Sequence, residues 1–111
     1  MPTFIDFRDG RGGYVCARMG WDISSLLTWA AFTRYVHTLP GRVDMLKEAM
    51  QAAREMSPTE RLVAAAALAA ADFTQQAVDL GENDAFWWRA RNLDAAGALA
   101  VSATLMRMDA R

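Results

Sequence analysis

The stretch from Ser57 to Gly81 constrains the fold more than any other part of this 111-residue chain. Ser57 is a good N-cap, Pro58 suits the first position of a helix, and Glu60 can complete a capping box. Gly81 can adopt the left-handed conformation that closes a helix. These signals predict one helix over residues 58–80, about 35 Å long.

This predicted helix contains ten consecutive apolar residues, Leu62 to Ala71, most of them alanine. Alanine is the best helix former and tolerates exposure, so one side of the run could simply face water. Alternatively, the helix is central and is covered on more than one side, by its own domain or by a second copy of the chain. The run is about half as long as a membrane crossing requires and its flanks are charged, so we expect no transmembrane span.

The first twenty residues differ in composition from the rest of the chain. Two short segments rich in β-branched or aromatic residues, Thr3–Arg8 and Tyr14–Met19, flank the glycine-rich run Asp9–Gly13. This pattern predicts a β-hairpin over residues 1–20. A lone hairpin is marginal in water, so its apolar side must pack on the helices or extend a partner's sheet. The residues expected on that side are Ile5, Phe7, Val15 and Met19.

Two further helices are predicted between the hairpin and Ser57. Asp22 is a good N-cap for a helix over residues 22–39, which Pro40 ends. The segment 41–56 has the clearest amphipathic pattern in the chain. Its expected buried side consists of Val43, Leu46, Met50 and Ala53.

A fourth helix is predicted over residues 84–108. Gly97 would weaken it unless it marks a close crossing with the Ala-rich helix 58–80, with which it would form an antiparallel hairpin. The predicted fold is therefore mainly α, with an N-terminal β-hairpin followed by a small four-helix bundle. We expect residues 1–111 to form a single domain.

Charge and cysteine content narrow the classes of function. A net charge of -1 argues against a large uniform attraction to nucleic acid or to anionic lipid. Cys16 is the only cysteine, which excludes an internal disulfide and favours a cytoplasmic location. His37 is the only histidine, so the usual zinc-ligand sets are excluded and we predict neither a metal nor a cofactor. His37 is expected at a helix C-terminus, where a basic group is favourable.

The strongest functional candidate is the group Trp87, Trp88, Arg89 and Arg91. Adjacent tryptophans on a helix point about 100° apart, so one core stripe cannot easily bury both. Tryptophan and arginine are also the types most enriched at binding hot spots. These residues are therefore predicted to contact a partner. The alternative is that one tryptophan seals the core and the other packs under the hairpin.

A second candidate is the group of arginines around the glycine-rich run, namely Arg8, Arg11 and Arg18. They could form a basic tip that contacts phosphate or nucleic acid. The run lacks the order of a phosphate-binding loop, so the alternative is a simple turn.

Three hypotheses of function follow. The first is a small non-enzymatic protein-binding module, such as an adaptor, a regulator or an inhibitor that covers a partner's surface. It allows for a homodimer through the Ala-rich helices. The second is a nucleic-acid-binding protein that uses the arginine and tryptophan surface. The third is a small enzyme or metabolite carrier with His37 or Cys16 as its reactive group.

Overall fold

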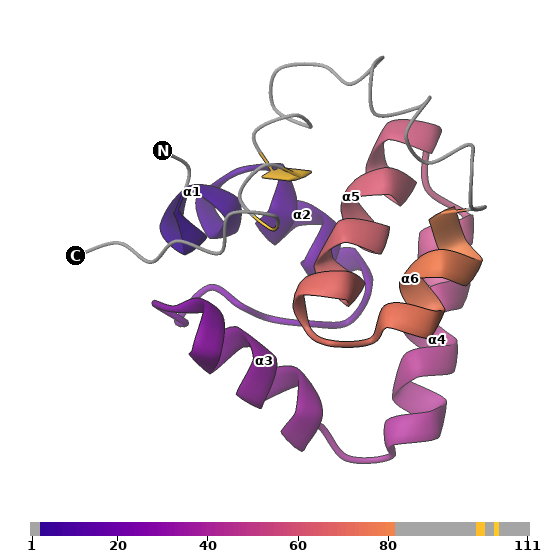
Figure 1. The fold of residues 1–111 in the computed structure, drawn as a ribbon, viewed down its shortest axis with the longest axis horizontal. Helices are drawn as coiled ribbons and strands as arrows, with labels where there is room; N and C mark the ends of the chain where they lie inside the picture. The colour runs from indigo at the N-terminus through magenta and orange to yellow at the C-terminus, as the bar shows by residue number, and fades with distance from the viewer. Residues whose placement is uncertain (1–2, 82–99, 102–103, 105–111) are drawn as a thin grey trace.

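The computed structural model describes residues 3–81, 100–101 and 104 (Figure 1). Its described part contains six helices, which are α1 (Phe4–Asp9), α2 (Arg11–Arg18), α3 (Trp29–Thr38), α4 (Arg42–Arg54), α5 (Pro58–Ala70) and α6 (Thr74–Gly81). Helix α5 packs against α2, α4 and α6 and occupies the middle of the fold. The predicted helix 84–108 lies outside the described residues, apart from three helical positions, Ala100, Val101 and Thr104.

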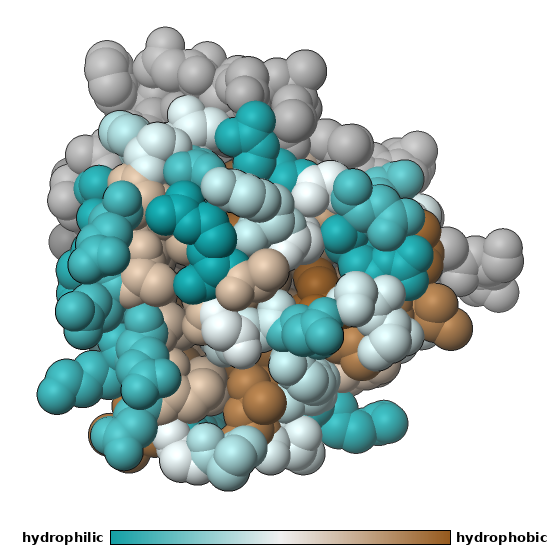
Figure 2. Space-filling view, turned by 180° about the vertical axis from the view of Figure 1, so that it is seen from behind, coloured by the Kyte–Doolittle hydropathy of each residue, from teal (hydrophilic) through white to brown (hydrophobic). Residues whose placement is uncertain are grey.

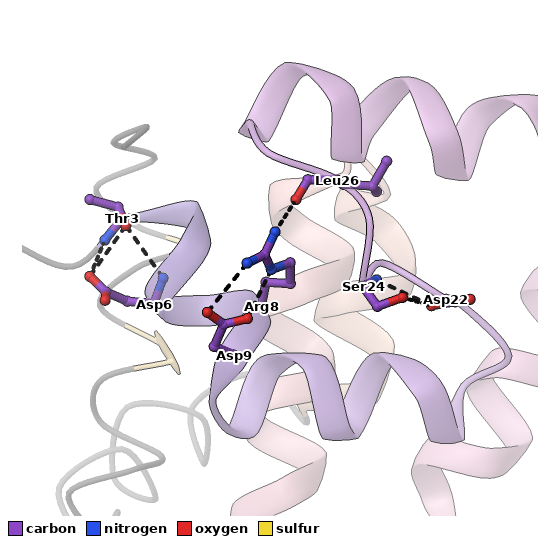
Figure 3. Close-up of polar contacts among 7 residues, drawn as sticks. All are labelled: Thr3, Asp6, Arg8, Asp9, Asp22, Ser24 and Leu26. Atoms are coloured by element: carbon purple, nitrogen blue, oxygen red, sulfur yellow. Dashed lines mark hydrogen bonds and ion pairs between the residues drawn. The ribbon is translucent and has the colours of Figure 1, made fainter. Parts of the chain in front are cut away.

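The predicted N-terminal β-hairpin is wrong, because residues 4–18 form α1 and α2 and the described residues contain no β-strand. A capping box starts α1 (Figure 3). The Thr3 hydroxyl accepts a hydrogen bond from the Asp6 backbone N–H, and the Asp6 carboxylate accepts one from the Thr3 N–H at 2.9 Å. These bonds satisfy backbone donors of the first turn, which stabilises a helix.

The glycines of the expected hairpin turn instead allow α1 and α2 to pack closely. Gly10 ends α1 and begins α2. A Cβ atom on Gly12 would collide with the Phe7 ring, and one on Gly13 would collide with the carbonyl oxygen of Arg8. The observed packing of α1 on α2 therefore leaves no space for a side chain larger than hydrogen at these two positions.

An aromatic cluster joins α1 to α3. Phe4 and Phe7 of α1 contact Trp29 and Phe32 of α3, with ring centroids 5.0 to 6.1 Å apart. All four side chains are buried. Several of these pairs are edge-to-face, the geometry that aromatic quadrupoles favour.

The helix predicted from Asp22 begins later, at Trp29. Thr28 is its N-cap, and its hydroxyl accepts a hydrogen bond from the Ala31 N–H at 3.0 Å. Asp22 instead accepts hydrogen bonds from the backbone and side chain of Ser24, which forms a local turn (Figure 3). Trp21 and Ile23 of this connection are buried in the core.

Helix α4 lies within the range predicted for it, 41–56. Ala49, Met50 and Ala53 form its buried face. Val43 was expected there, but this residue of the first turn is 80% exposed.

The long helix predicted over residues 58–80 is divided into α5 and α6. It breaks at Asp72, which has a positive φ of 66°. The break turns the chain so that Phe73 donates its backbone N–H to Leu68 and buries its ring. Ala77 and Leu80 of α6 are buried in the same core as Phe73.

Helix α5 is covered on all sides within the chain. Every residue from Leu62 to Leu68 is buried, and Ala69 alone in the apolar run is half-buried. The explanation that this helix exposes its alanines to water is therefore wrong. A homodimer through the Ala-rich helices stays a prediction, and for α5 it would require this helix to be uncovered first. Within the described part of the chain, no helix is both long and apolar enough to span a bilayer.

Candidate partner-binding groove

A groove of about 330 Å³ lies where the end of α2 and the α3–α4 connection meet one side of α4. We call it the α2–α4 groove. Its lining consists of Met19, Gly20, Leu39, Pro40, Gly41, Asp44, Met45 and Glu48. Figure 2 views the molecule from behind, so that α4 lies at the left, where hydrophilic residues border a band of less polar ones.

The floor of the α2–α4 groove is apolar. Met19 is only 4% exposed and belongs to the hydrophobic core, and Leu39 and Met45 are half-buried against that core. Methionine has a flexible and polarisable side chain that adapts to irregular neighbours. This floor can therefore accept an apolar group of varied shape.

Two glycines belong to the lining of the α2–α4 groove. Gly20, just after α2, has a φ of 92°, and Gly41, the N-cap of α4, has a φ of 66°. A Cβ atom added to either residue would meet no atom of the described chain within 4 Å. Both glycines serve turns that need positive φ, and neither is pressed against another element.

The edge of the α2–α4 groove carries Asp44 and Glu48, one helical turn apart on α4. Both residues are exposed, and in the described part of the structure neither forms an ion pair or a side-chain hydrogen bond. Like charges at this spacing destabilise a helix by about 0.2–0.5 kcal/mol. The helix dipole favours Asp44 in the first turn, but it acts less on Glu48.

A polar junction lies next to the Leu39–Gly41 part of the groove lining in the sequence. His37, at the end of α3, places Nε2 2.6 Å from the Ala71 carbonyl oxygen and Nδ1 3.1 Å from the Arg42 guanidinium. Because a carbonyl only accepts and a guanidinium only donates, these partners select the neutral tautomer with hydrogen on Nε2. The ring also stacks on Phe73 at 4.5 Å. The junction ties the two ends of the Leu39–Gly41 connection to the α5–α6 turn.

The three arginines predicted as a basic tip each lie beside a carboxylate. Arg8 forms an ion pair with Asp9 at 2.9 Å and donates to the Leu26 carbonyl oxygen (Figure 3). Arg18 lies 3.3 Å from Glu60, and Arg11 also acts on that carboxylate electrostatically. Positive charge in this region is therefore locally compensated.

Several neighbours compensate the charge of Glu60. Its burial alone would raise its pKa, but hydrogen bonds from Ser57 and the charges of Arg18 and Arg11 together lower the pKa below its ordinary value. The charged form of Glu60 therefore stabilises the start of α5.

The other candidates from the sequence divide into two groups. Trp87, Trp88, Arg89 and Arg91 lie outside the described residues, so their role in partner contact stays a prediction. Cys16 is fully buried, and burial raises the pKa of its thiol far above the ordinary value. A thiol held in this state is a poor nucleophile. No group of three or more potential metal ligands occurs among residues 3–81, 100–101 and 104.

Sequence reasoning missed the α2–α4 groove because its walls come from distant segments. It placed Asp44 and Glu48 only on the side of the predicted helix 41–56 opposite its expected buried residues. The signal that was present is the coincidence of chain breaks at Gly20 and Pro40–Gly41 with two acidic residues one turn apart on the next helix.

No family model matches the chain, and no curated protein and no solved structure is significantly similar to it.

Proposed function

We propose that this protein is a small non-enzymatic protein-binding module, such as an adaptor, a regulator or an inhibitor, which receives a segment of its partner in the α2–α4 groove. The observation that carries the proposal is the combination of an apolar floor with an exposed carboxylate edge. Protein interfaces have this organisation, with an apolar centre surrounded by a polar rim.

The size of the α2–α4 groove supports a protein partner. At about 330 Å³ it is at the lower end of the range for pockets that enclose a small-molecule ligand. A groove of this size fits one or two side chains of a larger partner. The remaining binding energy would come from the surface around it.

The enzyme hypothesis would use the side chains of Cys16 and His37, and both make contacts inside the fold. Cys16 is enclosed in the core, and both ring nitrogens of His37 are engaged by Ala71 and Arg42. Their observed contacts support a contribution to packing, and so they favour binding over catalysis.

The test is affinity capture of the tagged protein from lysate of its source, divided into nuclease-treated and untreated halves. We expect a stoichiometric protein partner that survives nuclease. Material that disappears with nuclease would contradict the proposal and favour the nucleic-acid hypothesis based on the arginine and tryptophan surface.

A matched pair of variants assigns the capture to the α2–α4 groove. The groove variant, Asp44→Asn with Glu48→Gln, removes both edge charges. The control variant, Glu55→Gln with Asp79→Asn, removes two exposed carboxylates that do not line the groove. We expect the groove variant to lose most of the captured partner and the control variant to retain it. Equal capture by both variants would place the binding surface elsewhere.

A further inference from the structure

We infer that the α2–α4 groove recognises an arginine side chain in an extended segment of the partner protein. The aliphatic stem of this arginine lies on the floor formed by Met19 and Met45, and its guanidinium lies between the carboxylates of Asp44 and Glu48. This inference rests on the proposed function and names the chemistry of the partner.

Charge complementarity is the first argument. Within the described residues, Asp44 and Glu48 have no cationic neighbour in hydrogen-bond or ion-pair contact, whereas Asp9 and Glu60 each have one. Two like charges one turn apart repel each other, and a cation placed between them removes that repulsion. The groove edge is therefore complementary to a positive group and unfavourable for an anion.

The floor of the groove gives the second argument. Met19 and Met45 line the groove beside the carboxylates, so a ligand must present apolar atoms close to its charge. Arginine and lysine side chains have this form, with an apolar stem that packs on a surface and a charged end that stays polar. A bare metal ion or a small ammonium ion would leave the floor uncovered.

The spacing of the carboxylates favours arginine over lysine. Residues at i and i+4 on a helix have their Cβ atoms about 5–6 Å apart, so two separate carboxylates border the site. The planar guanidinium has several N–H donors in a fixed fork and can donate to both carboxylates at once. The lysine ammonium is a compact, strongly hydrated charge and loses more hydration at such a site.

The probes for a direct test are the tripeptides Ac-Gly-Arg-Gly-NH2, Ac-Gly-Lys-Gly-NH2 and the citrulline analogue of the first. Citrulline has nearly the shape of arginine without its charge. The protein carries ¹³C-methyl methionine, and methyl chemical shifts are followed by NMR during titration. Met19 and Met45 line the groove, whereas Met56 is buried and lies outside the lining, so it is the internal control.

We expect the arginine peptide to shift the Met19 and Met45 methyl signals in a saturable manner and to leave Met56 unchanged. The citrulline peptide should bind about tenfold more weakly, because two charge contacts are lost. The groove variant should weaken arginine binding to the same extent, and the control variant should bind normally. Binding of citrulline equal to that of arginine would overturn the charge argument. Binding of lysine equal to that of arginine would overturn the choice of arginine.

Failure of the arginine site can be distinguished from failure of the proposed protein-binding function. A nuclease-resistant partner captured equally by the wild-type protein and the groove variant, together with no methionine shifts, would overturn the arginine site and leave a protein-binding module. Saturable arginine binding without any captured protein would instead contradict the proposed function. The peptide comparison uses the wild-type protein, so it does not depend on how any variant folds.

Discussion

The two ends of α2 use glycine in opposite ways. At its start, Gly12 and Gly13 allow α1 to approach so closely that no space for a side chain remains. Beyond its other end, Gly20 turns the chain with a positive φ and leaves open space, and Gly41 does the same across the α2–α4 groove. Glycine is therefore required by close packing at Gly12 and Gly13, and by positive φ in a turn at Gly20 and Gly41.

The largest expected effect on stability is at Gly13, where α2 packs closely against α1. Gly13→Ala places a Cβ atom against the backbone carbonyl of Arg8, which cannot move without disturbing α1. Although alanine is the better helix former, we expect a loss of about 2–3 kcal/mol in the free energy of unfolding from this overpacking. Urea denaturation followed by circular dichroism measures it. An unchanged midpoint would show that α1 and α2 are not in close contact.

A smaller effect on stability is expected at Gly41, in the lining of the α2–α4 groove. Gly41→Ala meets no clash but must adopt positive φ, which costs about 1 kcal/mol. Gly41→Asn should cost less, because asparagine tolerates this conformation. Its side chain would lie in the α2–α4 groove and weaken binding of the arginine tripeptide several-fold.

The same denaturation and NMR experiments check both variants of Gly41. A loss of stability in Gly41→Ala as large as that in Gly13→Ala would contradict the difference between a closely packed glycine and one in open space.

The smallest expected effect on stability concerns carboxylates: Glu60 at the start of α5, and Asp44 and Glu48 at the edge of the α2–α4 groove. Glu60→Gln keeps the capping box, because glutamine can replace glutamate there, but loses the ionic contact with Arg18. At neutral pH we expect a loss of about 0.5 kcal/mol in the free energy of unfolding. The groove variant should change it by less than that, since its two charges have no cationic contact in the described structure.

The pH dependence of Glu60 has a defined sign. Its pKa is lower in the folded protein, so its contribution to stability is fully present above the ordinary glutamate pKa and is lost as the pH falls through the lowered folded value. Thermal unfolding of the wild-type protein and Glu60→Gln between pH 7 and pH 3 should converge at the acidic end. A difference that grows as the pH falls would contradict this assignment.

Two elements were predicted correctly from the sequence, the start of α5 and the range of α4. Ser57, Pro58 and Glu60 mark the start of α5, and the amphipathic pattern of 41–56 corresponds to α4. Each of these signals depends on residues within one or two turns, but the equally local N-cap signal at Asp22 did not start a helix.

The N-terminal prediction was wrong because short apolar segments fit a strand and a helix equally well. We attribute the choice of helix over strand to tertiary contacts, namely the contact of Gly12 with Phe7 and the packing of α1 against α3. The break at Asp72 also has no local signal, since a non-glycine residue with positive φ is uncommon.

The α2–α4 groove was not predictable for the same reason. Met19 and Glu48 are distant in sequence, and only the packing of α2 near α4 brings them to one site. The sequence did contain the acidic pair and the glycines. It contained no signal that shows which helices pack against each other.

The most direct test of the central claim is site-specific photo-crosslinking in lysate of the source. A diazirine-bearing aliphatic amino acid replaces Met45 in the groove or, as the control, Gln51 on the exposed side of the same helix. Mass spectrometry then identifies the crosslinked peptides. The account predicts that position 45 alone crosslinks a partner protein, at a segment that contains arginine. Equal crosslinking from position 51, or from position 45 to segments without a basic residue, would contradict it.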